Sequence, residues 1–207
     1  RAGGVIQFDM APLKGEVGRE LTGQFLERLI MLADRKEAEV IILHIESPGG
    51  FISSLDRMLE VLESERDVKI VAYTDDDCFS AAAIFAMACD EFWVGPGAAV
   101  GAAVLWSAGE DGRPSAVDAK FASAQAASWR AQVEKMGRPG ELVDAMVLQD
   151  VELWADKSTT PWTLYREEPR GEARDRVERL DSKDAVLTLT AKDLVNTGAA
   201  QGSAGSI

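Results

Sequence analysis

The sequence predicts an α/β protein in which helices connect the strands of a mostly parallel sheet. Short apolar runs suited to strands alternate along the chain with longer segments suited to helices. Residues 40–45 are apolar at every position except His44, which is typical of a parallel strand buried on both faces. Glycine-rich turns follow two of the runs, at residues 47–50 and 95–97. The resulting order, β-α-β-α-β-α-β, favours right-handed crossovers.

Strands are predicted where apolar and β-branched residues lie between polar or glycine-rich turns. These segments are residues 5–10, 40–45, 68–73 and 91–94. A polar turn at residues 74–77 follows the third of them and precedes a helix.

Helices are predicted in the intervening segments. Residues 16–35 carry apolar side chains at three-to-four spacing, as an amphipathic helix does. Residues 80–89 are small and apolar and predict a helix that packs closely against its surroundings. Residues 116–136 form a long helical segment that Gly137 should end.

Two further helices are predicted from capping boxes, in which a serine or threonine is followed three residues later by an acidic side chain. Ser53 and Asp56 match this pattern before a helix with leucine and methionine on one face. Thr190 and Asp193 match it near the C-terminus, where Gly198 should close a short helix.

The length predicts a single domain, residues 1–207, with one elaboration. Residues 155–182 lack apolar periodicity and hold a dense run of charges, which predicts a solvated insertion peripheral to the main core.

Composition excludes several classes of protein. Hydrophobic residues make up 46% of the chain, which is enough for a core and too many for a disordered protein. A net charge of -13 opposes binding to nucleic acid or to anionic lipid. The longest apolar run, residues 79–89, falls short of the roughly 20 residues needed to span a bilayer. The chain starts at Arg1 without a signal-like segment, so we expect a soluble domain excised from a longer protein.

Cys78 and Cys89 are expected to be free thiols. In a helical segment a rise of about 1.5 Å per residue puts their Cα atoms well over 10 Å apart, whereas a disulfide needs less than about 7 Å. With His44 as the only histidine, no cluster of metal ligands is expected, and no cofactor.

Two segments contain residues that could take part in catalysis. Residues 46–50, Glu-Ser-Pro-Gly-Gly, follow a buried strand, and paired glycines let a backbone approach closely with its N–H groups outward. The same residues also suit an ordinary strand-to-helix turn. Ser80 begins the small-residue helix, where a serine is most often an N-cap. It can also be a nucleophile there, aided by the helix dipole and by amides that stabilise an oxyanion.

Together these segments resemble the ClpP/crotonase superfamily, and most closely the NfeD-type membrane-associated serine proteases, which are related to signal peptide peptidase A. The resemblance rests on the strand and Ser-Pro-Gly-Gly turn of residues 40–50, on Ser80 and Asp90, and on residues 92–103. It extends over about residues 4–154 and 185–204. Ala82 departs from the pattern, because the NfeD-type proteins usually have glycine there.

The resemblance implies a ClpP/crotonase-like fold and a serine endopeptidase that cleaves apolar segments of membrane-associated proteins. It implies that Ser80 is the nucleophile and that the backbone N–H groups of Gly50 and Ala81 form the oxyanion hole. Substrate would bind along Gly49, Gly50 and Phe51 by strand addition. It also implies a homo-oligomer whose parent chain is membrane-anchored, with this domain on the extracytoplasmic face, periplasmic or equivalent.

A serine nucleophile needs a base. His44 is expected to be structural, because it lies inside a strand. A lysine can serve when burial lowers its pKa. Lys120 follows Ser80 by forty residues and opens a small-residue helical segment, about where the NfeD-type proteins have their catalytic lysine. Asp118 beside it would oppose this role if it faced the same way, and Lys135 is the next candidate.

Two other functions stay open from the sequence. A crotonase-type acyl-CoA enzyme shares the fold and the oxyanion geometry, although the negative net charge of the chain opposes binding of the CoA phosphates. A non-catalytic assembly or interaction module would retain the fold without using Ser80 and Lys120.

Overall fold

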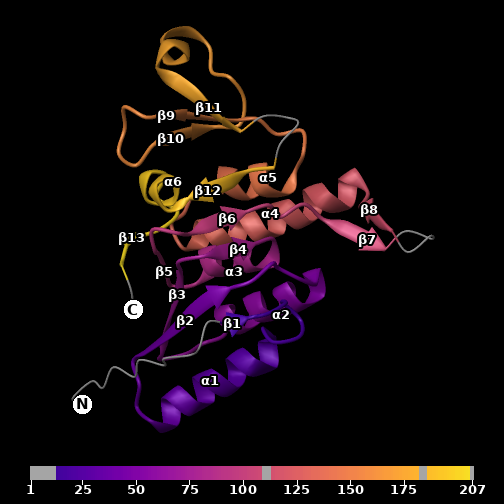
Figure 1. The fold of residues 1–207 in the computed structure, drawn as a ribbon, viewed down its shortest axis with the longest axis vertical. Coiled ribbons are helices and arrows are strands. Elements are labelled where there is room, and N and C mark those ends of the chain that lie inside the picture. The colour runs from indigo at the N-terminus through magenta and orange to yellow at the C-terminus, as the bar shows by residue number, and fades with distance from the viewer. Residues whose placement is uncertain (1–12, 109–112, 182–185, 206–207) are drawn as a thin grey trace.

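The computed structural model of this chain describes residues 13–108, 113–181 and 186–205, and its largest sheet is parallel (Figure 1). Five strands lie in it, in the order β1 (Leu13–Lys14), β2 (Val40–Glu46), β3 (Lys69–Thr74), β5 (Glu91–Val94) and β13 (Gly202–Ser203). The predicted α/β class with a mostly parallel sheet is confirmed. The strand predicted at residues 5–10 lies outside the described residues.

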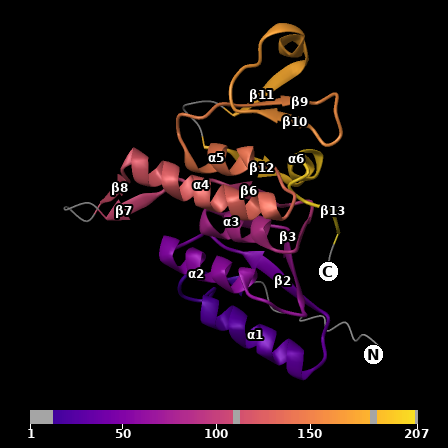
Figure 2. The ribbon, with the colours of Figure 1, turned by 180° about the vertical axis from the view of Figure 1, so that it is seen from behind.

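Helices supply the crossovers that parallel neighbours need. Between β1 and β2, β2 and β3, and β3 and β5 of the main sheet these are α1 (Gly23–Arg35), α2 (Ile52–Glu63) and α3 (Ala81–Ala88). The later helices are α4 (Ala119–Lys135), α5 (Glu141–Val147) and α6 (Ala191–Asn196). The first five pack each against the next in the chain (Figure 2). The side chain of Thr22 accepts the amide of Phe25, so the first helix begins at residue 23 rather than at residue 16.

A second, smaller sheet leads the chain to Ser80. It consists of β12 (Thr188–Thr190), β6 (Ala99–Gly101) and β4 (Asp77–Phe79). β4 runs parallel to β6, and β12 runs antiparallel to it. A hairpin of β7 (Trp106–Ala108) and β8 (Pro114–Ala116) then connects this sheet to α4.

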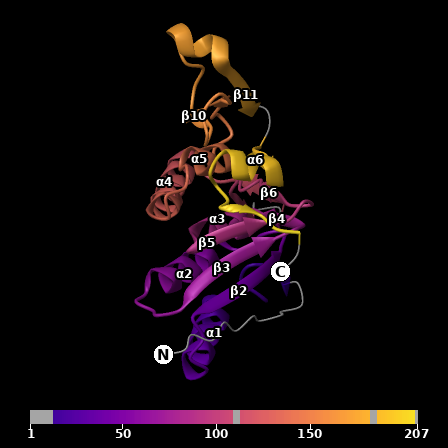
Figure 3. The ribbon, with the colours of Figure 1, turned by 90° about the vertical axis from the view of Figure 1, so that its left-hand side faces the viewer.

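A third sheet stands away from the main body (Figure 3). It is antiparallel, in the order β10 (Thr163–Tyr165), β9 (Leu153–Asp156) and β11 (Val177–Asp181), and a 3-10 helix (Gly171–Arg176) precedes β11. The buried carboxylate of Asp144 in α5 pairs with Arg130 at 2.8 Å and with Arg166 at 3.2 Å. The charged segment 155–182 thus includes ordered strands, joined to α5 through Asp144.

β2 is buried on one face only, whereas the sequence predicted burial on both. Ile41, Leu43 and Ile45 are fully buried, and the alternate residues, His44 among them, are half-buried. Since successive side chains of a strand point to opposite faces, only one face of β2 lies against the core.

The two predicted capping boxes have different outcomes. Thr190 and Asp193 form a complete box at the start of α6, as predicted. At α2 the N-cap is Phe51, and no side chain caps the helix, so the box predicted from Ser53 and Asp56 is wrong. The carboxylate of Asp56 instead accepts hydrogen bonds from a different helix, as described below.

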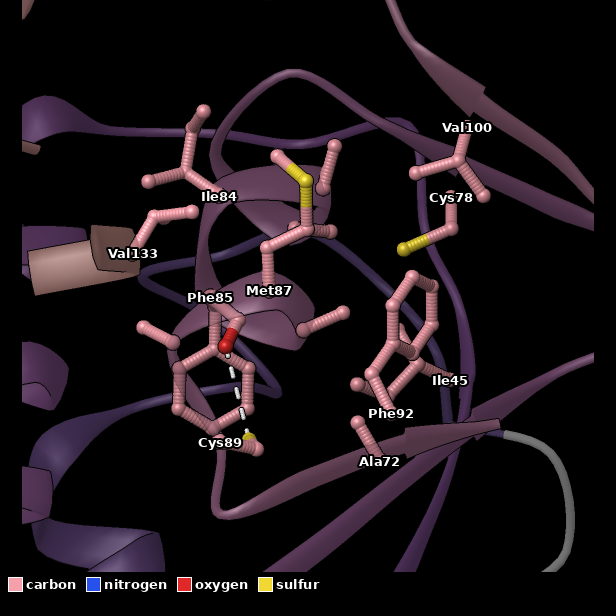
Figure 4. Packing of buried hydrophobic residues seen from close by; sticks show 14 of the residues in the cluster. Ile45, Ala72, Cys78, Ile84, Phe85, Met87, Cys89, Phe92, Val100 and Val133 are labelled. Atoms are coloured by element: carbon pink, nitrogen blue, oxygen red, sulfur yellow. Dashed lines mark hydrogen bonds between the residues drawn. The ribbon is translucent and has the colours of Figure 1, made fainter. Parts of the chain in front are cut away.

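The core surrounds α3, all of whose residues are buried. Figure 4 shows Phe85 and Met87 of this helix near Phe92 and Val100, which come from β5 and β6. Its small residues let neighbouring elements approach closely. Among the described residues, no helix is both long enough and apolar enough to cross a membrane.

Cys78 and Cys89 are buried free thiols, as predicted (Figure 4). Burial raises the pKa of Cys78 and raises the pKa of Cys89 to about 12.

We expect neither thiol to react with DTNB at about pH 8 in the folded protein, and both to react once guanidinium unfolds it. Because unfolded thiols ionise near pH 8.5, their ionisation should lower the free energy of unfolding as the pH rises above about 8.5. Rapid reaction of DTNB with the folded protein would contradict the expected protection of the thiols.

A buried cation, Arg138, holds the end of α3. It donates to the carbonyls of Met87 and Cys89 at 2.7 Å and of Ala199 at 2.9 Å, and to the side chain of Gln201 at 3.1 Å. Burial lowers its pKa.

We expect Arg138→Met to lower the free energy of unfolding by about 3 kcal/mol or more, because it leaves these buried acceptors without donors. Urea unfolding measures the effect. Arg57→Met is the matched control: its ion pairs with Glu27 and Glu60 are exposed, so its loss should change the free energy of unfolding far less. Equal unfolding midpoints for the two variants would contradict the assignment.

Candidate active site

Ser80 lies between β4 and α3 in a conformation that residues other than glycine rarely adopt. Its φ is 55° and its ψ is -127°, and its amide donates to the carbonyl of Gly101 at 2.7 Å. Such strain costs about 1–3 kcal/mol and clusters at active sites. The side chain does not cap α3, and its hydroxyl bonds to no described residue. The hydroxyl therefore does not have the ordinary N-cap role.

The turn at residues 47–50 lies beside Ser80 because its backbone joins β4. Ser47 exchanges two backbone hydrogen bonds of 2.9 Å with that strand. Gly49 has a φ of 98°, and a Cβ at this position would lie 2.4 Å from the Cβ of Ser80. Only glycine permits so close an approach in this conformation.

Buried Ser47 also supports the turn from within. Its hydroxyl donates to the carbonyl of Gly15 at 2.6 Å and accepts the amide of Gly49 at 3.1 Å. A Cβ on Gly50 would lie 2.0 Å from the carbonyl oxygen of Val17. The sequence motif indicated the glycines, but the contacts with residues 15–17 have no local sequence signal.

Gly50 and Ala81 line the same cavity as Ser80. No described residue accepts a hydrogen bond from either amide. An oxyanion hole requires N–H donors of this kind next to the nucleophile. The structure thus places Ser80 and both predicted donors along one cavity.

The cavity has a volume of about 530 Å³, within the range of about 300–1,000 Å³ that is typical of ligand pockets. The residues that line it are Gly50, Phe51, Ile52, Ser53, Asp56, Ser80, Ala81, Val104, Leu105, Trp106, Phe121, Gln125 and Trp129. Phe51, Trp106 and Phe121 are exposed by 52%, 54% and 47%. We call this cavity, with its aromatic wall, the Ser80 cleft.

Asp56 joins the two helices that flank the Ser80 cleft. Its Oδ1 accepts from Nε2 of Gln125 and from Nε1 of Trp129, both at 2.9 Å. These bonds set α4 relative to α2, which follows the glycine turn. Asp56 is also the one charged side chain among the described residues that line the cleft. Across the described residues, no group of three or more His, Cys, Asp or Glu side chains could hold a metal ion.

Lys120 does not line the Ser80 cleft. It is exposed in the first turn of α4, where its amide donates to the side chain of Asp118 at 2.9 Å. Phe121 and Gln125 line the cleft, and Lys120 lies one position earlier, about 100° around the helix. The structure therefore brings the predicted nucleophile and oxyanion donors together, but not the predicted base.

The other candidate bases also lie outside the cleft. The Nε2 of His44 lies 2.7 Å from Oδ1 of Asp75, and its ring meets Tyr73 edge-on at 5.2 Å. Lys135 pairs with Glu63 at the far end of α2 and α4, beside a separate cavity.

Comparison with known proteins relates the sequence to one family. A model described as the NfeD1b N-terminal domain matches residues 7–164. The membrane protein NfeD1b of Bacillus subtilis (strain 168) is 30% identical over 128 residues, which are 62% of this chain and 28% of that protein. The chain thus spans less than a third of the length of this relative.

Solved structures show the same fold at low sequence identity. A variant of the 1510-N membrane-bound stomatin-specific protease is similar with a TM-score of 0.73 and 16% identity, over 100% of this chain and 83% of that chain. The ClpP protease catalytic domain from Plasmodium falciparum is similar with a TM-score of 0.58 and 10% identity, over 94% of this chain and 83% of that chain. The predicted ClpP-like fold is confirmed.

Proposed function

This chain belongs to the family described by the NfeD1b N-terminal domain, and on that premise we propose that it is a serine endopeptidase that uses a Ser-Lys dyad. One observation carries the proposal. Ser80, whose hydroxyl does not cap its helix, lies in a strained turn and lines an aromatic-walled cleft together with Gly50 and Ala81.

In the proposed reaction, Oγ of Ser80 attacks the carbonyl carbon of the scissile peptide. The neutral amine of Lys120 takes the hydroxyl proton, and the amides of Gly50 and Ala81 hold the oxyanion. The carbon–nitrogen bond then breaks, and Lys120 gives its proton to the leaving amine. Water, deprotonated by the same lysine, hydrolyses the acyl-enzyme and regenerates Ser80.

The mechanism requires Lys120 to reach the cleft. Its Nζ must come within about 3 Å of Oγ of Ser80, so the exposed side chain of Lys120 has to move into the cleft when substrate binds. Related structures support a serine and a lysine as the reacting pair. The 1510-N protease was solved with a serine replaced by alanine, and with a lysine replaced by alanine in complex with a substrate peptide.

The proposed substrates are apolar segments of membrane-associated proteins, which would lie along residues 49–51 by strand addition. The half-exposed aromatic side chains of the Ser80 cleft support an apolar substrate.

The Bacillus subtilis relative is named a membrane protein, which supports a membrane-anchored parent chain. We place this domain on the extracytoplasmic face and propose that it acts as a homo-oligomer.

Labelling with a fluorophosphonate probe tests the proposed function. We expect one probe per chain, located on Ser80 by peptide mass spectrometry, and no label on Ser80→Ala. An unlabelled wild-type protein would refute the peptidase. Binding of acetyl-CoA without labelling would favour the acyl-CoA enzyme instead.

We expect His44→Phe to keep kcat/KM for an apolar peptide within about twofold of the wild-type value. His44 lies outside the Ser80 cleft, and its partner Asp75 is exposed enough to be hydrated when the imidazole is removed. Asp75→Asn serves as the partner control. A large loss of turnover at unchanged thermal stability would show that His44, rather than Lys120, is the base.

A further inference from the structure

Asp56 has a charge that its hydrogen bonds do not neutralise. Its two donors, Gln125 and Trp129, are both neutral and both reach Oδ1. No described cation lies within ion-pair distance of it, and no described residue donates to Oδ2. The adjacent Arg57 pairs with Glu27 and Glu60 instead. A carboxylate at an apolar surface is stabilised by a cationic partner.

We propose that Asp56 recognises a cationic side chain, lysine or arginine, of the peptide that occupies the Ser80 cleft. The inference rests on the proposed peptidase function and narrows its substrate: an apolar segment that contains a basic residue close to the scissile bond. The two hydrogen bonds to Oδ1 hold the carboxylate in place, so that it meets the incoming cation already oriented.

The cleft wall suits the rest of such a side chain. The rings of Phe51, Trp106 and Phe121 are half-exposed there. Aromatic faces attract cations, and an apolar wall accommodates the aliphatic stem of lysine or arginine. One site thus offers contacts for the stem and for the charged head.

The net charge of the whole chain also favours basic substrates. With a net charge of -13, the protein attracts basic segments and repels acidic ones before contact. This long-range part of the preference should weaken as salt is added.

The test must separate recognition of a cation from the structural link between α2 and α4. Asp56→Asn removes the charge but keeps an oxygen that can accept from Gln125 and Trp129. Glu63→Gln is the matched control, because Glu63 links the same two helices through Lys135 and lies outside the Ser80 cleft.

The substrates are paired apolar peptides that differ at one position, lysine against norleucine, with that position scanned along both sides of the scissile bond. We expect wild-type kcat/KM to favour lysine by about tenfold at one position or more. In Asp56→Asn the ratio should fall to about one because the lysine peptide is cleaved more slowly. In Glu63→Gln the ratio should stay at the wild-type value.

Two outcomes would overturn the inference while the fluorophosphonate probe still labels Ser80. These are a wild-type ratio of about one at every position, and an Asp56→Asn variant that slows both peptides equally, which would make Asp56 a structural link only. If the wild-type protein neither takes up the probe nor cleaves any peptide, the proposed function itself fails, and this inference fails with it.

Discussion

Replacing Ser80 by alanine is expected to lower kcat/KM for peptide cleavage by about a thousandfold or more. The hydroxyl is the proposed nucleophile, and neither the oxyanion amides nor the base can replace it. The fold should be unaffected, because the hydroxyl bonds to no described residue and alanine has a similar conformational cost at a φ of 55°. Thermal unfolding should therefore match the wild type.

Ser64→Ala is the control for this prediction. Ser64 donates to the carbonyl of Val61 at the end of α2 and lies outside the Ser80 cleft, so its loss should affect stability slightly and turnover not at all. Full cleavage by Ser80→Ala would remove this serine from the mechanism.

Substituting Lys120 is expected to have an effect of similar size, for a different reason. Lys120→Ala lacks a base, and Lys120→Arg keeps its proton at any workable pH, so both should lose activity by about a thousandfold. Peptide binding, measured by fluorescence anisotropy, should persist in both variants because the glycine turn and the aromatic wall are unchanged.

Lys135→Arg is the matched control on the same helix. Lys135 pairs with Glu63 beside a separate cavity, and this substitution keeps the charge, so turnover should be retained. Near wild-type turnover by Lys120→Arg would refute the dyad. A crystal structure with a covalent inhibitor on Ser80 should show the Lys120 amine within about 3 Å of Oγ.

Local patterns in the sequence were enough to predict much of the fold. The apolar run at residues 40–45, the helix at residues 80–89 and the capping box of Thr190 with Asp193 all depend on periodicity or on spacings of a few residues. Such patterns act over one turn or one strand, so they can be recognised without knowledge of the tertiary structure. The glycine turn and Ser80 were singled out as candidates in the same way, whereas the predicted catalytic role of Ser80 rests on the resemblance to the NfeD-type proteases.

Contacts between distant segments could not be predicted from the sequence, because they depend on how the elements pack. Asp56 has the spacing of a capping box with Ser53, yet it bonds to Gln125 and Trp129, which lie 69 and 73 residues away. Lys120 begins the expected helix, but the rotation of α4 directs Phe121 and Gln125, rather than the lysine, into the cleft.

The physical reason is that a side chain's partner depends on which elements pack together and at what rotation. Helix packing sets the rotation of α4, and the order of the strands brings the turn at residues 47–50 against β4 and Ser80. The sequence predicted most strands of the main sheet, most of the helices, and Ser80, Gly50 and Ala81 as candidate site residues. The tertiary structure decided that Ser80, Gly50, Ala81 and Asp56 share one cleft.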